Sequence, residues 1–161
     1  MVTLNNCKGV SLIELVITVT ILAILAAGVM PLARNAELRK KEIELKRNLR
    51  VMRTAIDDYK KTFEKMPAGP LKTGSGYPKE LNVLIEGYDF GESKKEKKKF
   101  LRRKVTDPFH PPENDRDETW GWGLRSSADK PNSRIWGKED VYDVYSLSEG
   151  TALDGTKYNE W

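Results

Sequence analysis

The chain has 161 residues, a net charge of +4 and one histidine, His110. Its one cysteine, Cys7, excludes an intramolecular disulfide and a cysteine-based metal site, and the two counts together exclude most zinc, Cys-His and haem chemistry. The residue counts do not exclude a Ser-His-Asp triad. However, the sequence has no strand-turn-helix serine motif, so we expect no enzymatic activity.

The charges are unevenly distributed along the chain. Residues 33–66 carry 11 basic and 6 acidic side chains, residues 92–104 carry 8 and 2, and residues 105–161 carry 6 and 12. Basic stretches of this kind occur in nucleic-acid-binding proteins, but they also form ordinary solvated faces of helices and loops. We favour solvated faces and expect no nucleic-acid partner.

A short polar segment precedes a long apolar one at the N-terminus. Residues 10–32 are nearly all apolar, with Glu14 as their one charge. An apolar run of about 20 residues is long enough to cross a bilayer as a helix. No small-residue cleavage site follows it, so we expect the run to be retained in the mature protein. Near its end, Pro31 is expected to bend or locally unwind the helix.

The N-terminus resembles the cleavage motif of type IV prepilins and type II secretion pseudopilins, over the residues Lys8-Gly9-Val10-Ser11-Leu12-Ile13-Glu14-Leu15. The resemblance combines a basic leader, a glycine, a glutamate at fixed spacing and an unbroken apolar run. It implies that prepilin peptidase cuts between Gly9 and Val10, that residues 1–9 are a leader peptide, and that Val10 is then N-methylated. The family more often has phenylalanine where Val10 stands.

The same resemblance implies a role for Glu14 in assembly. A carboxylate in hydrocarbon costs several kcal/mol unless it is paired. In a filament, Glu14 would face the N-terminal amine of a neighbouring Val10, and this pair would set the register of the subunits. The alternative is that Glu14 lies near the membrane surface and reaches water. The resemblance also covers Pro31, since the family often has a helix break at this distance from the cleavage site.

The orientation of the chain in the membrane is predicted differently by two signals. The basic residues after the apolar run outnumber Lys8, and on charge alone they would place the soluble part in the cytoplasm. The prepilin-like motif places that part in the periplasm. We follow the motif because it is the more specific signal, and expect a single-pass inner-membrane protein.

Residues 33–66 are predicted to form an amphipathic stem helix. No glycine or proline occurs between Ala33 and Met66, and apolar residues recur at spacings of three, four and seven. They are Leu38, Leu45, Leu49, Met52, Ile56, Tyr59 and Phe63. This stripe could form a coiled-coil dimer, but we expect it to pack on the domain that follows.

Residues 67–161 are predicted to form a small globular periplasmic domain. Residues 78–86 read as a turn or two of helix, and residues 120–125 and 141–146 as two strands of an antiparallel hairpin. Residues 129–140 are expected to be a surface loop between them. The predicted architecture is therefore α+β, a long N-terminal helix packed on a small antiparallel sheet, as in the pilin fold.

This part of the chain resembles the major, G-type pseudopilin of type II secretion. The matching parts are Leu101-Arg102-Arg103, Asp107-Pro108, Trp120-Gly121, Asp143-Val144-Tyr145-Ser146-Leu147, Gly150 and an acidic loop before Trp161. That family often binds calcium in its C-terminal loop. The resemblance implies calcium ligands here at the Leu147 carbonyl, Ser148, Glu149 and Asp154, and the alternative is a solvated acidic loop without a metal.

The function that these resemblances imply is that of a structural subunit. We expect a homo-oligomeric pseudopilus filament that drives protein export across the outer membrane, with minor pseudopilins and an inner-membrane assembly platform as partners. A type IV pilus subunit for adhesion or motility is the nearest alternative. A membrane-anchored periplasmic binding module and a membrane-anchored hydrolase are more distant alternatives.

Overall fold

The computed structural model describes residues 9–65, 74–90 and 97–161, except for the side chains of residues 28–32. Most of the predicted leader therefore lies outside the described residues. The chain divides after Arg39 into two compact units, residues 1–39 and residues 40–161.

The longest element is α1 (Leu12–Glu64), a helix of 53 residues. At 1.5 Å per residue its length is about 80 Å. It passes through Pro31, so that residue does not end the helix. Two threonines in its apolar part donate their hydroxyls to backbone carbonyls three or four residues earlier, Thr18 at 2.9 Å and Thr20 at 2.7 Å. These bonds satisfy the two hydroxyl groups on an otherwise largely apolar helix surface.

The stripe predicted on the stem helix forms one wall of the hydrophobic core. Six of its seven members are buried: Leu45, Leu49, Met52, Ile56, Tyr59 and Phe63. Leu38 is half-buried and belongs to the other unit. Burying one such side chain contributes about 1.5–3 kcal/mol, so the stripe supplies much of the stability of residues 40–161. The stripe therefore packs on the domain that follows it, as predicted.

Aromatic side chains surround Tyr59 at the end of α1. Its ring centroid lies 5.7 Å from that of Tyr88, 5.3 Å from that of Phe90 and 5.4 Å from that of Phe100, in tilted or edge-to-face pairs. Burial, with a smaller contribution from Tyr88, raises the pKa of Tyr59 to about 12. This cluster fixes the segments after α1 against the end of the helix.

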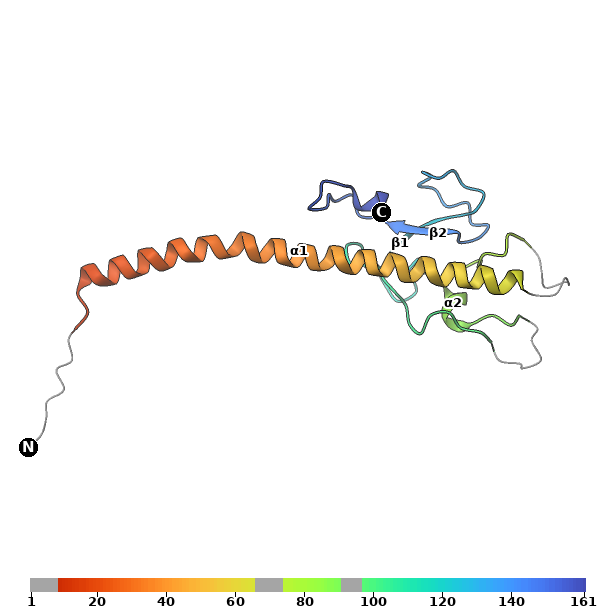
Figure 1. The fold of residues 1–161 in the computed structure, drawn as a ribbon, viewed down its shortest axis with the longest axis horizontal. Helices are drawn as coiled ribbons and strands as arrows, with labels where there is room; N and C mark the ends of the chain where they lie inside the picture. Colours follow the sequence, from red (N-terminus) through yellow and green to blue (C-terminus); the bar gives the residue numbers. More distant parts are fainter. Residues whose placement is uncertain (1–8, 66–73, 91–96) are drawn as a thin grey trace, which may run out of the picture. The chain divides into compact units, whose positions relative to one another are not determined.

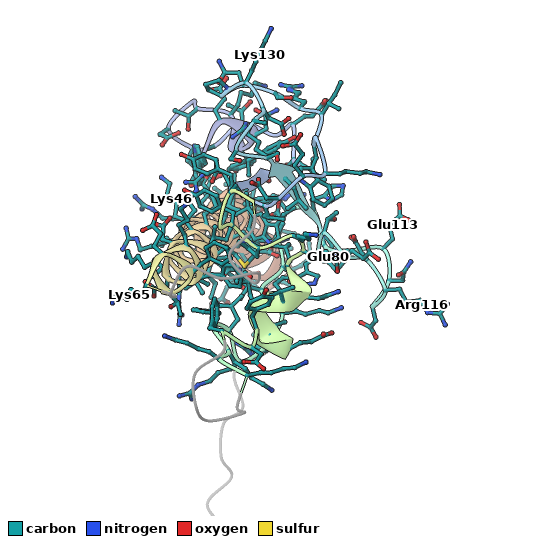
Figure 2. All side chains as sticks on the ribbon, turned by 90° about the vertical axis from the view of Figure 1, so that its right-hand side faces the viewer. Lys46, Lys65, Glu80, Glu113, Arg116 and Lys130 are labelled. Atoms are coloured by element: carbon teal, nitrogen blue, oxygen red, sulfur yellow. The ribbon has the colours of Figure 1, made fainter. Side chains whose placement is uncertain are left out.

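The predicted hairpin is confirmed, with shorter strands than expected. The strands β1 (Trp122–Arg125) and β2 (Asp143–Ser146) pair antiparallel, with Trp122 opposite Ser146 and Arg125 opposite Asp143. The short helix α2 (Asn82–Glu86) forms within the predicted helical segment. Figures 1 and 2 show α2 and the hairpin on different sides of the second half of α1. The predicted α+β architecture, a long helix packed on a small antiparallel sheet, is thus confirmed.

The loop between the strands ends in a buried carboxylate. Asp140 is 3% exposed and accepts hydrogen bonds from the hydroxyls of Ser126 at 2.9 Å, Ser127 at 2.6 Å, and Ser75. Burial alone would raise the pKa of Asp140, but these hydrogen bonds, led by that of Ser127, outweigh it and lower the pKa. The predicted surface loop is therefore fastened to the body of the domain at Asp140.

Candidate functional site

The predicted processing site lies in an open segment before α1. Gly9 and Val10 are both exposed, and a side-chain carbon placed on Gly9 would meet nothing within 4 Å. The helix begins just after them, where the Leu15 amide donates to the Ser11 carbonyl at 3.0 Å. The peptide bond between Gly9 and Val10 therefore precedes the regular hydrogen bonds of the helix and is accessible to a peptidase.

Val10 and the N-terminal part of α1 expose a largely apolar surface. Eleven large apolar side chains are each at least 50% exposed: Val10, Leu12, Ile13, Leu15, Val16, Ile17, Val19, Ile21, Leu22, Ile24 and Leu25. Each would gain about 1.5–3 kcal/mol on full burial. Exposed apolar surfaces of this extent mark sites of protein or membrane interaction. This part of the helix is therefore built to be covered by something other than its own chain.

Glu14 lies within this apolar surface. Its side chain is exposed, and no hydrogen bond or ion pair reaches it from the described residues. If its surroundings were buried by lipid or by neighbouring helices, the carboxylate would need a positively charged partner.

The predicted membrane span is residues 10–32. The side chains of its last five residues, 28–32, lie outside the described part of the chain. Among the described residues, no helix combines the length and the apolar character needed to cross a membrane.

The C-terminal loop forms a small hairpin. Thr151 and Lys157 pair as an isolated bridge, and the Tyr158 amide donates to the Gly150 carbonyl at 3.2 Å. The Ala152 amide donates to the Thr156 carbonyl at 2.8 Å, which closes the turn. The four predicted calcium ligands thus fall into two groups, with Leu147, Ser148 and Glu149 at the base of the hairpin and Asp154 at its tip.

Existing hydrogen bonds already use oxygens of these groups. The Ser148 Oγ atom accepts a hydrogen bond from the Gly150 amide at 3.4 Å. Calcium takes six to eight oxygens at 2.3–2.6 Å, so one ion could hold all four groups only if the tip of the hairpin met its base. The Oδ1 atom of Asp154 accepts hydrogen bonds from the Thr156 amide at 3.0 Å and hydroxyl at 2.6 Å, which lower its pKa. In the described part of the chain, no three acidic, histidine or cysteine side chains come together as a metal site.

Side chains on α1 anchor this hairpin, through contacts that the sequence alone did not predict. The Oε1 atom of Glu42 accepts hydrogen bonds from the Leu153 amide at 2.8 Å and from the Tyr158 hydroxyl at 3.0 Å. Burial first, and then the bond to Glu42, raises the pKa of Tyr158 to about 12. Arg53 donates to the Trp161 carbonyl at 2.9 Å. Because these partners are more than 100 positions apart, only the spacing of Glu42 from the buried stripe hinted that it faces the domain.

A basic groove of about 480 Å³ runs beside α1. Two exposed apolar residues of the helix, Ile43 and Val51, contribute to it, and so do Arg102 and Arg103. Its full lining is Lys40, Ile43, Glu44, Arg47, Asn48, Val51, Leu101, Arg102, Arg103 and Val105. The lining holds no serine, cysteine or histidine that could act as a nucleophile or its base.

Comparisons with known proteins give one match, at the N-terminus. The model of the prokaryotic N-terminal methylation motif matches residues 4–30. It covers Gly9, Val10 and Glu14 and much of the exposed apolar surface. No curated protein matches the chain, and no solved structure matches it.

Proposed function

Since its N-terminal segment identifies the chain as a type IV prepilin-like protein, we propose that it is the structural subunit of a type II secretion pseudopilus. Its role is mechanical and not enzymatic. The processed subunits stack into a filament whose growth drives folded proteins through an outer-membrane channel.

The exposed apolar surface of α1 is the observation that carries this proposal. Eleven apolar side chains are at least half exposed in the single chain, and all of them lie within the matched residues 4–30. Lipid would cover them before assembly, and the equivalent helices of neighbouring subunits would cover them in the filament. Apolar burial of this size anchors the helix in the inner membrane, and close packing of the apolar helices then holds the filament together.

Glu14 sets the register of the proposed filament. Cleavage between Gly9 and Val10 creates a charged amine at Val10. In the filament core this amine pairs with Glu14 of an adjacent subunit, because either charge alone would be costly among apolar helices. The Val10 amine and the Glu14 carboxylate meet at only one axial displacement between neighbouring subunits. The ion pair therefore fixes that displacement.

The resemblance of the globular domain to the G-type pseudopilin is the reason for proposing secretion before a pilus. Four of the residues that carry this resemblance, Trp120, Val144, Tyr145 and Ser146, are buried. The proposed partners are prepilin peptidase, minor pseudopilins and the inner-membrane assembly platform.

Mass spectrometry and mutagenesis test the proposal. The intact mass of the membrane-extracted protein should show loss of residues 1–9 and gain of one methyl group. Glu14→Gln should abolish filaments seen by electron microscopy and stop protein export. Glu37→Gln, at an exposed position of the same helix, is the matched control and should do neither. An uncut N-terminus, or filaments that form normally with Glu14→Gln, would refute the assembly mechanism.

The same experiment separates the pseudopilus from the type IV pilus. Deletion of the gene should block export of folded proteins if the filament is a pseudopilus. Loss of long surface fibres with export intact would favour the pilus.

A further inference from the structure

Two lysines contact the C-terminal hairpin, for which the resemblance to G-type pseudopilins implies calcium: Lys157 from within the hairpin and Lys46 from α1. Lys157 Nζ donates to the Thr151 hydroxyl at 2.9 Å and reaches the Glu149 carbonyl at 3.5 Å. Its ammonium group therefore joins the two sides of the hairpin at its base. Carbonyl and hydroxyl oxygens are also ligands that calcium uses, so the ammonium occupies oxygens of the kind that a metal would need.

Lys46 of α1 holds the tip of the same hairpin. Its Nζ atom lies 3.8 Å from Oδ2 of Asp154 and 4.0 Å from the centroid of the Trp161 ring. Asp154, the one predicted carboxylate ligand at the tip, thus already faces a positive charge. A divalent cation brought to this carboxylate would be repelled by Lys46.

We propose that the ammonium groups of Lys157 and Lys46 replace calcium as the fastening of the C-terminal loop, so that folding of this subunit does not depend on divalent cations. Lys157 closes the hairpin on itself, and Lys46 ties its tip to the stem helix. Glu42, which accepts from both Leu153 and Tyr158, completes the attachment. The inference concerns how the subunit folds and is independent of the role proposed for its filament.

Thermal unfolding of the full chain in detergent tests the proposal. Melting curves followed by circular dichroism should coincide in millimolar calcium chloride and in excess EGTA. Lys157→Met and Lys46→Met should each lower the melting temperature by about 1–2 °C, because both contacts are exposed to solvent. Lys130→Met is the matched control, since Lys130 is exposed and points away from the body of the domain in Figure 2, and it should leave the melting temperature unchanged.

A melting temperature that rises with calcium and falls again with EGTA would overturn the proposal, as would an unchanged melting temperature for Lys157→Met. If Lys157→Met fails to accumulate, the wild-type chain still decides the matter. Terbium, a luminescent calcium substitute, should then give no saturable signal with the wild-type protein. Saturable terbium binding that calcium displaces would contradict the proposal.

Discussion

The hydroxyl of Ser146 donates a 2.6 Å hydrogen bond to Oδ2 of Asp107, and both side chains are fully buried. The other carboxylate oxygen, Oδ1, accepts from the Phe109 amide at 2.8 Å. The two contacts join the last residue of β2 to a turn that lies 39 positions earlier. A buried carboxylate is stable in such a place only while its oxygens accept hydrogen bonds.

Ser146→Ala should therefore destabilise the chain more than a surface substitution does. It removes one of the two hydrogen bonds and leaves a buried carboxylate oxygen without a donor, at a cost of about 1–3 kcal/mol. Urea unfolding followed by tryptophan fluorescence measures the change. Thr54→Ala, at an exposed position of α1, is the control and should change the unfolding free energy by less than about 0.5 kcal/mol.

Replacing Arg53 by lysine should lower the free energy of unfolding. Its guanidinium donates to Oδ1 of Asp143 at 2.8 Å, to the Val144 carbonyl at 3.1 Å and to the Trp161 carbonyl at 2.9 Å. The planar group makes these bonds in directions that an ammonium cannot reproduce. The Arg53 side chain is 41% exposed, so solvent reduces the loss on Arg53→Lys to about 1 kcal/mol.

The matched control for Arg53→Lys is Arg50→Lys. Arg50 is exposed on the same helix and makes no ion pair within the described residues. Equal unfolding free energies for the two variants would show that the Arg53 contacts contribute nothing to stability.

Tyr158 should make the stability of the chain depend on pH in the alkaline range. Its pKa is raised to about 12 in the fold, so the folded state keeps the phenol proton that the unfolded state loses near its ordinary value of 10. The stabilisation is complete below about pH 10 and is lost as the pH rises from 10 towards 12. Tyr59, also raised to about 12, contributes in the same window.

With Tyr158→Phe, the free energy of unfolding should therefore decrease less between pH 10 and pH 12 than it does in the wild type. At neutral pH the same variant should lose about 1 kcal/mol, because the hydrogen bond to Glu42 is gone. Urea titrations at neutral and alkaline pH measure both effects. Tyr142→Phe, at a half-exposed position, is the comparison. A Tyr158→Phe chain with the wild-type pH profile would exclude this source of pH dependence.

Gly123 should not accept a side chain. It lies opposite Tyr145 in the hairpin, and an added Cβ atom would lie 2.3 Å from that ring. The ring is 3% exposed and is also held by the Arg125 guanidinium, 4.2 Å from its centroid, so it cannot move aside without loss. Gly123→Ala should cost about 1–3 kcal/mol in thermal or urea unfolding.

The control for Gly123→Ala is Gly155→Asn. Gly155 has φ +87°, but an added Cβ atom would meet nothing within 4 Å, and asparagine tolerates this backbone region. Its expected cost is below about 1 kcal/mol. A larger loss for Gly155→Asn than for Gly123→Ala would contradict the steric explanation.

Periodicity was enough to predict the main elements of the fold. The stem stripe repeats with the period of a helix, and six of its seven residues are buried in the core. The alternation of residues 141–146 predicts a strand, and β2 forms within it. Both patterns are local, so each element could be predicted from residues that are close together in the sequence.

The contacts that fasten the C-terminal hairpin could not be predicted in the same way. Arg53 and Asp143 are 90 positions apart, and Glu42 and Tyr158 are 116 positions apart. Pro131 and Asn132 predict a surface loop over residues 129–140, whereas the burial of Asp140 depends on hydrogen bonds from serines at three separate positions. Likewise, the calcium ligands were implied by a resemblance, whereas the spacing of Asp154 from Ser148 follows from how the hairpin closes.

All the residues of the described core lie between Leu45 and Tyr158, so the apolar residues of the first turns of α1 take no part in it. The folded domain therefore keeps its shape whether those turns are surrounded by lipid or by other subunits. In the proposed filament, a subunit can be withdrawn into the bilayer and used again without unfolding. Growth and retraction would then use the same subunits repeatedly. In each cycle only the surroundings of the first turns of α1 would change, from lipid to other subunits and back.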